Sequence, residues 1–225
     1  MKRTLTLLIA GALWVACAGP PALKPLPPAA ADQTLDRCRG LFADRDWRLV
    51  HTIAAELPGA QTRTVIGVSL VSPAQRSIQA VLMTVEGLIL FDATYAAGAV
   101  DVHRALPPFD SEAFALGLMQ DVHLLFLAPD TTAFESGRLE SEGPACRFVR
   151  KDGRTLDIVP EADGRWHLSL YEGRRLLRQV RAEACGWAPR IPCRLELTAQ
   201  GRLSYHLEMS LIEAQPLQSL PAETE

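Results

Sequence analysis

The sequence predicts a mainly β fold with an inserted helix (α+β): a strongly curved antiparallel sheet, or incomplete β-barrel, of about ten strands that encloses a central apolar helix. Apolar and polar residues alternate over many short segments, as they do in half-buried strands. Glycines that follow an acidic residue, such as Gly87 and Gly153, separate these segments and suit tight hairpin turns. One longer segment, 110–127, is apolar almost all round, which is typical of an enclosed helix. The alternative is a sandwich of two sheets with this helix packed on one edge.

The strands are predicted where apolar and polar residues alternate with a period of two along the sequence. In the last of them Leu203, Tyr205 and Leu207 alternate with Ser204 and His206, so that one face is apolar and the other polar. The predicted strands, in meander order, are 47–55, 64–71, 77–85, 88–95, 100–105, 154–159, 166–171, 174–181, 193–198 and 203–211.

The inserted helix has clear ends in the sequence. Asp110 is a suitable N-cap after two prolines, and Pro129 ends the apolar run. Asp121 and His123 are predicted to form a polar strip that touches the rim of the sheet. A second, shorter helix is predicted over 34–42.

A helix that is apolar on all sides is enclosed by protein or by an apolar ligand. The concave side is therefore either a filled core or a cavity for acyl chains, and the sequence leaves both open. The residues that would line such a cavity are Phe114, Leu118, Met119, Val122, Leu125, Trp166, Leu168 and Leu207.

The N-terminus reads as a lipoprotein signal peptide over residues 1–16. Lys2 and Arg3 precede an apolar run at 5–15 that is too short to span a bilayer, which takes about 20 residues. Cys17 follows a small residue and is the predicted site of lipid attachment, by acyl chains such as palmitate. The alternative is an ordinary cleaved signal, because Trp14 stands where a small aliphatic residue is usual.

Three further segments follow Cys17. Residues 17–32 are rich in proline and alanine and predict an extended tether, residues 33–216 form one domain, and 217–225 form a flexible tail. Ala18 after the cysteine resembles the sorting signal for the outer membrane. We therefore expect a protein that is lipid-anchored in the outer membrane and faces the periplasm.

Composition and motifs exclude several functions. The net charge is −3 with no basic block, so nucleic acid is not an expected partner. The five histidines are scattered, and no serine elbow, zinc-protease motif or phosphate loop is present. We expect no enzyme activity, no cofactor and no metal, and the sequence points to no particular protein partner.

Four cysteines remain besides Cys17, an even number that suggests disulfides in an exported chain. Cys185 and Cys193 flank a loop between two strands, where a bridge is geometrically easy. That pairing leaves Cys38 with Cys146. Four cysteines allow three pairings, so this one stays a prediction.

The chain also resembles the periplasmic lipoprotein carrier and outer-membrane receptor family (LolA/LolB-like). The resemblance rests on Cys17, on the strand pair through 86–92, and on 106–110, which opens the inserted helix. It implies an apolar concave cavity that takes acyl chains of lipids or lipoproteins, with the inserted helix as a lid. The expected function is envelope lipid or lipoprotein trafficking or assembly. The alternative is a structural lipoprotein with a solid core that docks a protein partner.

Overall fold

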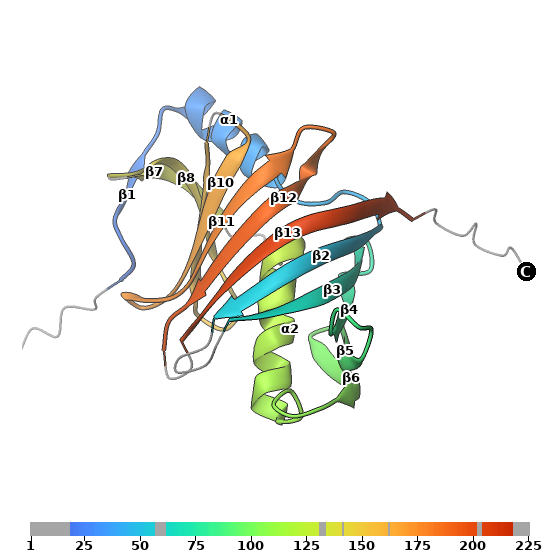
Figure 1. Ribbon diagram of the computed structural model, residues 1–225. Coiled ribbons are helices and arrows are strands. Elements are labelled where there is room, and N and C mark those ends of the chain that lie inside the picture. Colours follow the sequence, from blue (N-terminus) through green and yellow to red (C-terminus); the bar gives the residue numbers. More distant parts are fainter. Residues whose placement is uncertain are drawn as a thin grey trace, which may run out of the picture.

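The computed structural model describes residues 19–56, 62–130, 134–140, 142–161, 163–201 and 204–217. It contains a curved antiparallel sheet of 13 strands in the order β1-β7-β8-β9-β10-β11-β12-β13-β2-β3-β4-β5-β6, so β1 and β6 are the edges and the sheet is not closed. The sheet wraps around α2 (Figure 1), which is the architecture that the sequence predicts.

The strands and helices have the following bounds. Before the inserted helix the chain forms β1 (Leu23–Pro25), α1 (Pro28–Arg39), β2 (Trp47–Glu56), β3 (Arg63–Ser72), β4 (Ser77–Met83), β5 (Ile89–Ala96) and β6 (Ala99–Ala105). The inserted helix and the later strands are α2 (Glu112–Phe126), β7 (Phe134–Leu139), β8 (Gly143–Val149), β9 (Thr155–Pro160), β10 (Arg165–Glu172), β11 (Arg175–Cys185), β12 (Ala188–Ala199) and β13 (Tyr205–Pro216).

The strand order differs from the single meander that the sequence predicts. Strands β2–β6 form one meander and β7–β13 another, and they join because β13 pairs with β2, from His206 opposite Glu56 to Pro216 opposite Trp47. A period of two shows which residues form strands but not which strands are neighbours. The pairing of the last strand with an early one is therefore a tertiary feature.

All ten predicted strands are present, and β1, β7 and β8 are additional. Strand β7 contains Gly137, and β8 begins at Gly143 and Pro144, so neither shows a long apolar alternation. Strand β1 ends at Pro25, a residue that fits only at sheet edges. These short segments become strands because they pair with a neighbour, not because of strong intrinsic preference.

The first helix begins and ends earlier than predicted. It covers Pro28–Arg39 instead of 34–42, with a proline in its first turn, where a missing N–H costs nothing. The part of the expected tether that the structure describes thus includes β1 and the start of α1. Helix α1 packs on β7, β8 and β9.

The inserted helix lies where the sequence predicts it. Its N-cap is Ser111, one residue after the predicted Asp110, and the Ser111 hydroxyl accepts a hydrogen bond from the Phe114 amide at 3.3 Å. The helix packs against β4, β5 and β6 and passes along the concave side of the sheet (Figure 1). None of the helices among the described residues is long and apolar enough to cross a membrane.

Candidate functional site

Seven of the eight residues predicted to line an acyl cavity lie in two packed clusters, and the eighth is Phe114. In the first, Met119 is fully buried together with Phe91, and Leu118 and Val122 pack against the same cluster. Phe114 is half-buried at the start of α2. The first half of the helix is therefore held to the sheet by direct side-chain packing.

The second cluster continues from the end of α2 to the far strands. Leu125, Trp166 and Leu168 are buried in it, and Leu207 packs against it. Seven of the eight residues therefore contribute to core packing in this structure, and Phe114 packs edge-on against the ring of Phe109.

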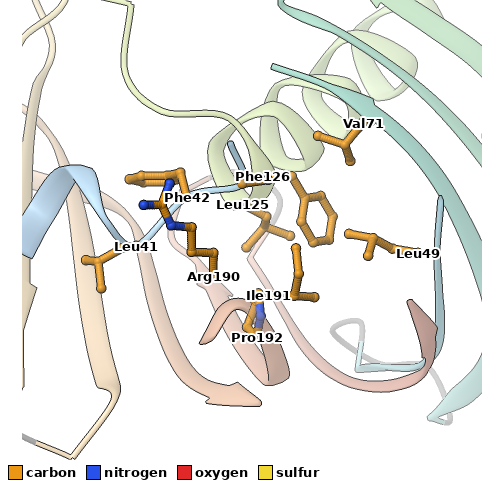
Figure 2. A pocket seen from close by; sticks show the side chains of 10 residues that line it. Leu41, Phe42, Leu49, Val71, Leu125, Phe126, Arg190, Ile191 and Pro192 are labelled. Carbon is orange, nitrogen blue, oxygen red and sulfur yellow. The ribbon is translucent and has the colours of Figure 1, made fainter. Parts of the chain in front are cut away.

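A small space remains where the end of α2 meets the sheet. It has a volume of about 10 Å³, close to the least that holds one water molecule. Figure 2 shows Leu125 and Phe126 of α2 pointing into it, opposite Leu49, Val71 and Ile191. This space is too small for an acyl chain.

Polar side chains also fix α2 to the sheet. The Asp121 carboxylate accepts a hydrogen bond from Nε of Arg178 on β11 at 2.8 Å and another from the Tyr205 hydroxyl on β13. Burial raises the pKa of Asp121, although Arg178 and Tyr205 both act to lower it. The predicted polar strip of α2 thus forms a buried contact with the sheet, where its partners lie on two different strands.

Two histidines on the concave side are kept neutral by burial. His51 on β2 packs against the ring of Phe126, and desolvation lowers its pKa to about 4. His123 on α2 meets the ring of Tyr95 edge-on at 4.8 Å between centroids, and burial, followed by the charge of Arg76, lowers its pKa to about 4. Both histidines therefore pack against aromatic rings on the concave side.

A larger apolar cleft lies away from α2, beside α1. It has a volume of about 380 Å³, within the range of ligand sites. The cleft lies between the end of α1, the segment after α2, and the first residues of β7 and the last of β8. Its lining residues are Cys38, Arg39, Phe42, Ala128, Pro129, Phe134 and Phe148.

Aromatic rings dominate the walls of this cleft. The rings of Phe134 and Phe148 face each other across β7 and β8 with centroids 6.3 Å apart. Arg39 is exposed, and its guanidinium lies over the Phe134 ring, 5.1 Å from the centroid. Among the lining residues Arg39 is the only charged one, so the cleft suits an apolar chain with one anionic end.

The sequence did not point to this cleft. Two of its walls come from β7 and β8, which carry no long alternation, and a third comes from the end of α1, which lies within the predicted helix. The aromatic pair Phe134 and Phe148 was visible in the sequence, but only the register of β7 with β8 places the two rings opposite each other.

The disulfides have the pairing that the sequence favoured. Cys38 is bonded to Cys146, which ties α1 to β8, and Cys185 is bonded to Cys193 at the neck of the β11–β12 hairpin. The first bond also forms the floor of the cleft through Cys38. Within the described ranges, no group of three or more His, Cys, Asp or Glu side chains is placed to hold a metal ion.

The predicted lipid-attachment residue Cys17, the signal at 1–16 and most of the tail at 217–225 lie outside the described residues. Lipid attachment and the domain boundaries therefore stay predictions.

No protein-family model and no curated protein matches this sequence. Among solved structures, the chain is similar to a LolA superfamily protein from Nitrosomonas europaea, with 14% identity, a TM-score of 0.46, and coverage of 85% of this chain and 94% of that one. A putative outer membrane lipoprotein-sorting protein domain from Vibrio parahaemolyticus has 10% identity, a TM-score of 0.47, and coverage of 86% and 95%. A DUF1329 family protein from Desulfovibrio piger has 12% identity, a TM-score of 0.46, and coverage of 85% and 93%.

Proposed function

We propose that this chain is a lipoprotein, anchored through Cys17 to the periplasmic face of the outer membrane, that binds an acyl chain of a lipid or lipoprotein. The observation that carries the proposal is the cleft of about 380 Å³ with three phenylalanines in its walls. The role is carriage or assembly of envelope lipids or lipoproteins, and it requires no chemical step.

The cleft has the physical properties that such a ligand needs. Burial of an acyl chain contributes about 0.8 kcal/mol per methylene, so about ten methylenes give useful affinity even after the cost of ordering the chain. The guanidinium of Arg39 supplies a positive charge for a carboxylate or phosphate at the end of that chain. Phe134 and Phe148 exclude water from the methylenes.

The binding test uses the full chain with Cys17→Ser, which exports the protein without acyl chains. We expect it to take up a fluorescent fatty acid, and the Ala128→Trp variant to bind it about tenfold more weakly because the indole fills the cleft. Ala128 lines the cleft, whereas Leu116 on α2 is exposed and lies outside it, so Leu116→Trp is the matched control. Absence of uptake, or uptake that Ala128→Trp leaves unchanged, contradicts this function.

The anchor has its own test. Cell fractionation should find the unmodified chain in the outer membrane and the Cys17→Ser variant in the soluble periplasmic fraction, with equal resistance to proteolysis. If the serine variant stays with the membrane, the anchor is not at Cys17.

The packed contact beneath α2 favours a second candidate, a structural lipoprotein with a solid core that docks a protein partner. The space of about 10 Å³ there supports this candidate. It predicts no fatty acid uptake, together with one partner that crosslinks at a defined surface.

A further inference from the structure

The N-terminal segment lies on both sides of one sheet edge. Strand β1 pairs with β7, with Leu23 opposite Leu139 and Pro25 opposite Gly137. The next element, α1, is joined to β8 by the disulfide of Cys146. The chain therefore runs from the edge strand β1, beside β7, to α1 on one face of the sheet (Figure 1).

Arg147 shows which face the first residues occupy. It follows Cys146 on β8, and successive strand residues project to opposite faces. The Cys146 side chain reaches α1, whereas the Arg147 guanidinium donates a hydrogen bond from Nη2 to the Pro21 carbonyl oxygen at 2.7 Å. Residues 19–22 thus begin on the outer face, which we define as the face of β7–β9 opposite α1.

The guanidinium that holds Pro21 is itself fixed. Its Nε and Nη2 donate to the two carboxylate oxygens of Asp157, both at 2.7 Å, and the Asp157 side chain is 1% exposed. A two-point pair of this kind leaves the guanidinium little freedom, and the second N–H of Nη2 is directed at the backbone of the N-terminal segment. Arg147 is therefore a positioning residue for Pro21.

Gly137 on β7 gives the N-terminal segment the space that it needs to pack against this strand. A Cβ at Gly137 would overlap Cγ of Leu23 and would lie 2.8 Å from the carbonyl oxygen of Lys24. Because Gly137 has no side chain, Leu23 packs onto the outer face with Leu139, Ala145 and Val159. The segment is thus held by a backbone ladder, an apolar contact and the Arg147 hydrogen bond.

These contacts limit how far the domain can move from an anchor at Cys17. Pro21 lies four positions after Cys17, so their Cα atoms are at most about 14 Å apart. A free extended tether from Cys17 to Asp32 would reach about 47 Å at about 3.1 Å per residue. The held segment thus removes most of the reach that the sequence suggested.

We propose that residues 19–25 form a strap that holds the β7–β9 edge against the surface of the bilayer that carries the Cys17 lipid. The proposal rests on the lipid anchor of the proposed function. Phe134 of β7 and Phe148 of β8 line the apolar cleft on the α1 face of the same strands, so the cleft lies across the sheet from the residues that begin the strap.

The test compares two variants of the chain, one with a donor fluorophore near the strap and one with the donor far from it. The lipidated full chain is reconstituted in vesicles of phosphatidylethanolamine and phosphatidylglycerol with a headgroup acceptor dye. The donor is attached at Glu135→Cys on β7 or at Val102→Cys on the opposite edge strand β6, both exposed. We expect more efficient energy transfer from position 135 than from position 102.

A double variant, Gly137→Val with Arg147→Lys, is then used to release the strap. The valine side chain blocks the pairing of β1 with β7. The lysine removes the hydrogen bond to Pro21 but keeps a positive charge beside Asp157. The reach from Cys17 should rise to about 31 Å, the length of ten extended residues up to Pro27, and the difference between the two probes should disappear. Gly19→Val is the matched control, because nothing lies within 4 Å of a Cβ at Gly19.

Equal transfer from both probes in the unmodified chain, or a difference that persists after release of the strap, overturns the strap but leaves the anchor intact. The anchor is checked by mass spectrometry of Cys17 and by sedimentation of the chain with the vesicles. If Cys17 carries no acyl chains and the protein stays in the supernatant, the proposed anchor and the strap are both wrong. A role of Arg147 in stability alone would change the denaturation midpoint of the variant without changing the difference between the probes.

Discussion

The carboxylate of Asp121 on α2 and Nε of Arg178 on β11 lie 2.8 Å apart in a contact that joins the inserted helix to the concave side of the sheet. The Asp121 side chain is 9% exposed and that of Arg178 is 21% exposed. This pair and the Tyr205 hydroxyl therefore fix the position of α2 along the sheet.

Asp121→Ala should lower the free energy of unfolding by about 3 to 5 kcal/mol, because it leaves the Arg178 charge buried without a partner. The double variant Asp121→Leu with Arg178→Met should lose clearly less than the sum of the two single changes. Urea unfolding of the four proteins in a double-mutant cycle measures the coupling. Glu213→Ala, which removes the exposed pair with Arg48, is the control and should cost less than about 1 kcal/mol. Additive losses at Asp121 and Arg178 would contradict this prediction.

Acid should destabilise the fold through its buried histidines. The ordinary histidine pKa is 6.5, and burial lowers the pKa values of His51 and His123 to about 4. Between pH 6.5 and 4 the unfolded chain binds protons that the folded chain excludes, so the free energy of unfolding falls as pH falls. Each histidine accounts for up to about 3 kcal/mol across that window.

His51→Phe should remove about half of this pH dependence, since one of two buried histidines no longer titrates. Chemical denaturation at a series of pH values measures the slope. His103→Phe is the control, because the His103 side chain is 42% exposed. An unchanged slope in His51→Phe would show that other groups cause the acid sensitivity.

The two disulfides should contribute unequally to stability. Cys38 and Cys146 are 108 residues apart, whereas Cys185 and Cys193 are 8 apart, and a longer closed loop restricts the unfolded chain more. Replacing the first pair by serine should cost about 4 to 5 kcal/mol and replacing the second about 2 to 3 kcal/mol. Thermal and urea unfolding of the two matched variants check the order, and a greater loss from the short loop would contradict it.

Core packing beneath α2 and ligand binding in the cleft should be separable. Met119 is fully buried between α2 and the sheet, so Met119→Ala should lower the free energy of unfolding by about 2 to 5 kcal/mol. Because Met119 does not line the cleft, the affinity of the Cys17→Ser chain for a fatty acid should not change. Weaker binding in Met119→Ala would instead place the acyl site beneath the helix.

Much of the fold was predictable from local pattern. The ten strands with strong alternation and the helix after the two prolines are all present, because burial of one strand face or of a whole helix leaves a clear periodicity. Strands β7 and β8 were not predictable, because Gly137, Gly143 and Pro144 interrupt the pattern and pairing with neighbours makes them strands. The candidate cleft depends on those two strands, so it could not be predicted either.

The sequence by itself determined the mainly antiparallel sheet and the enclosed helix, since both follow from residue types at short spacing. The tertiary structure alone decided that β13 pairs with β2, that Asp121 meets Arg178, and that Phe134 faces Phe148. It also decided that residues 23–25 pair with β7 at Gly137 instead of extending freely from Cys17. Contacts between residues far apart in the chain depend on how whole strands pack, and that arrangement leaves no periodic signal in the amino-acid sequence.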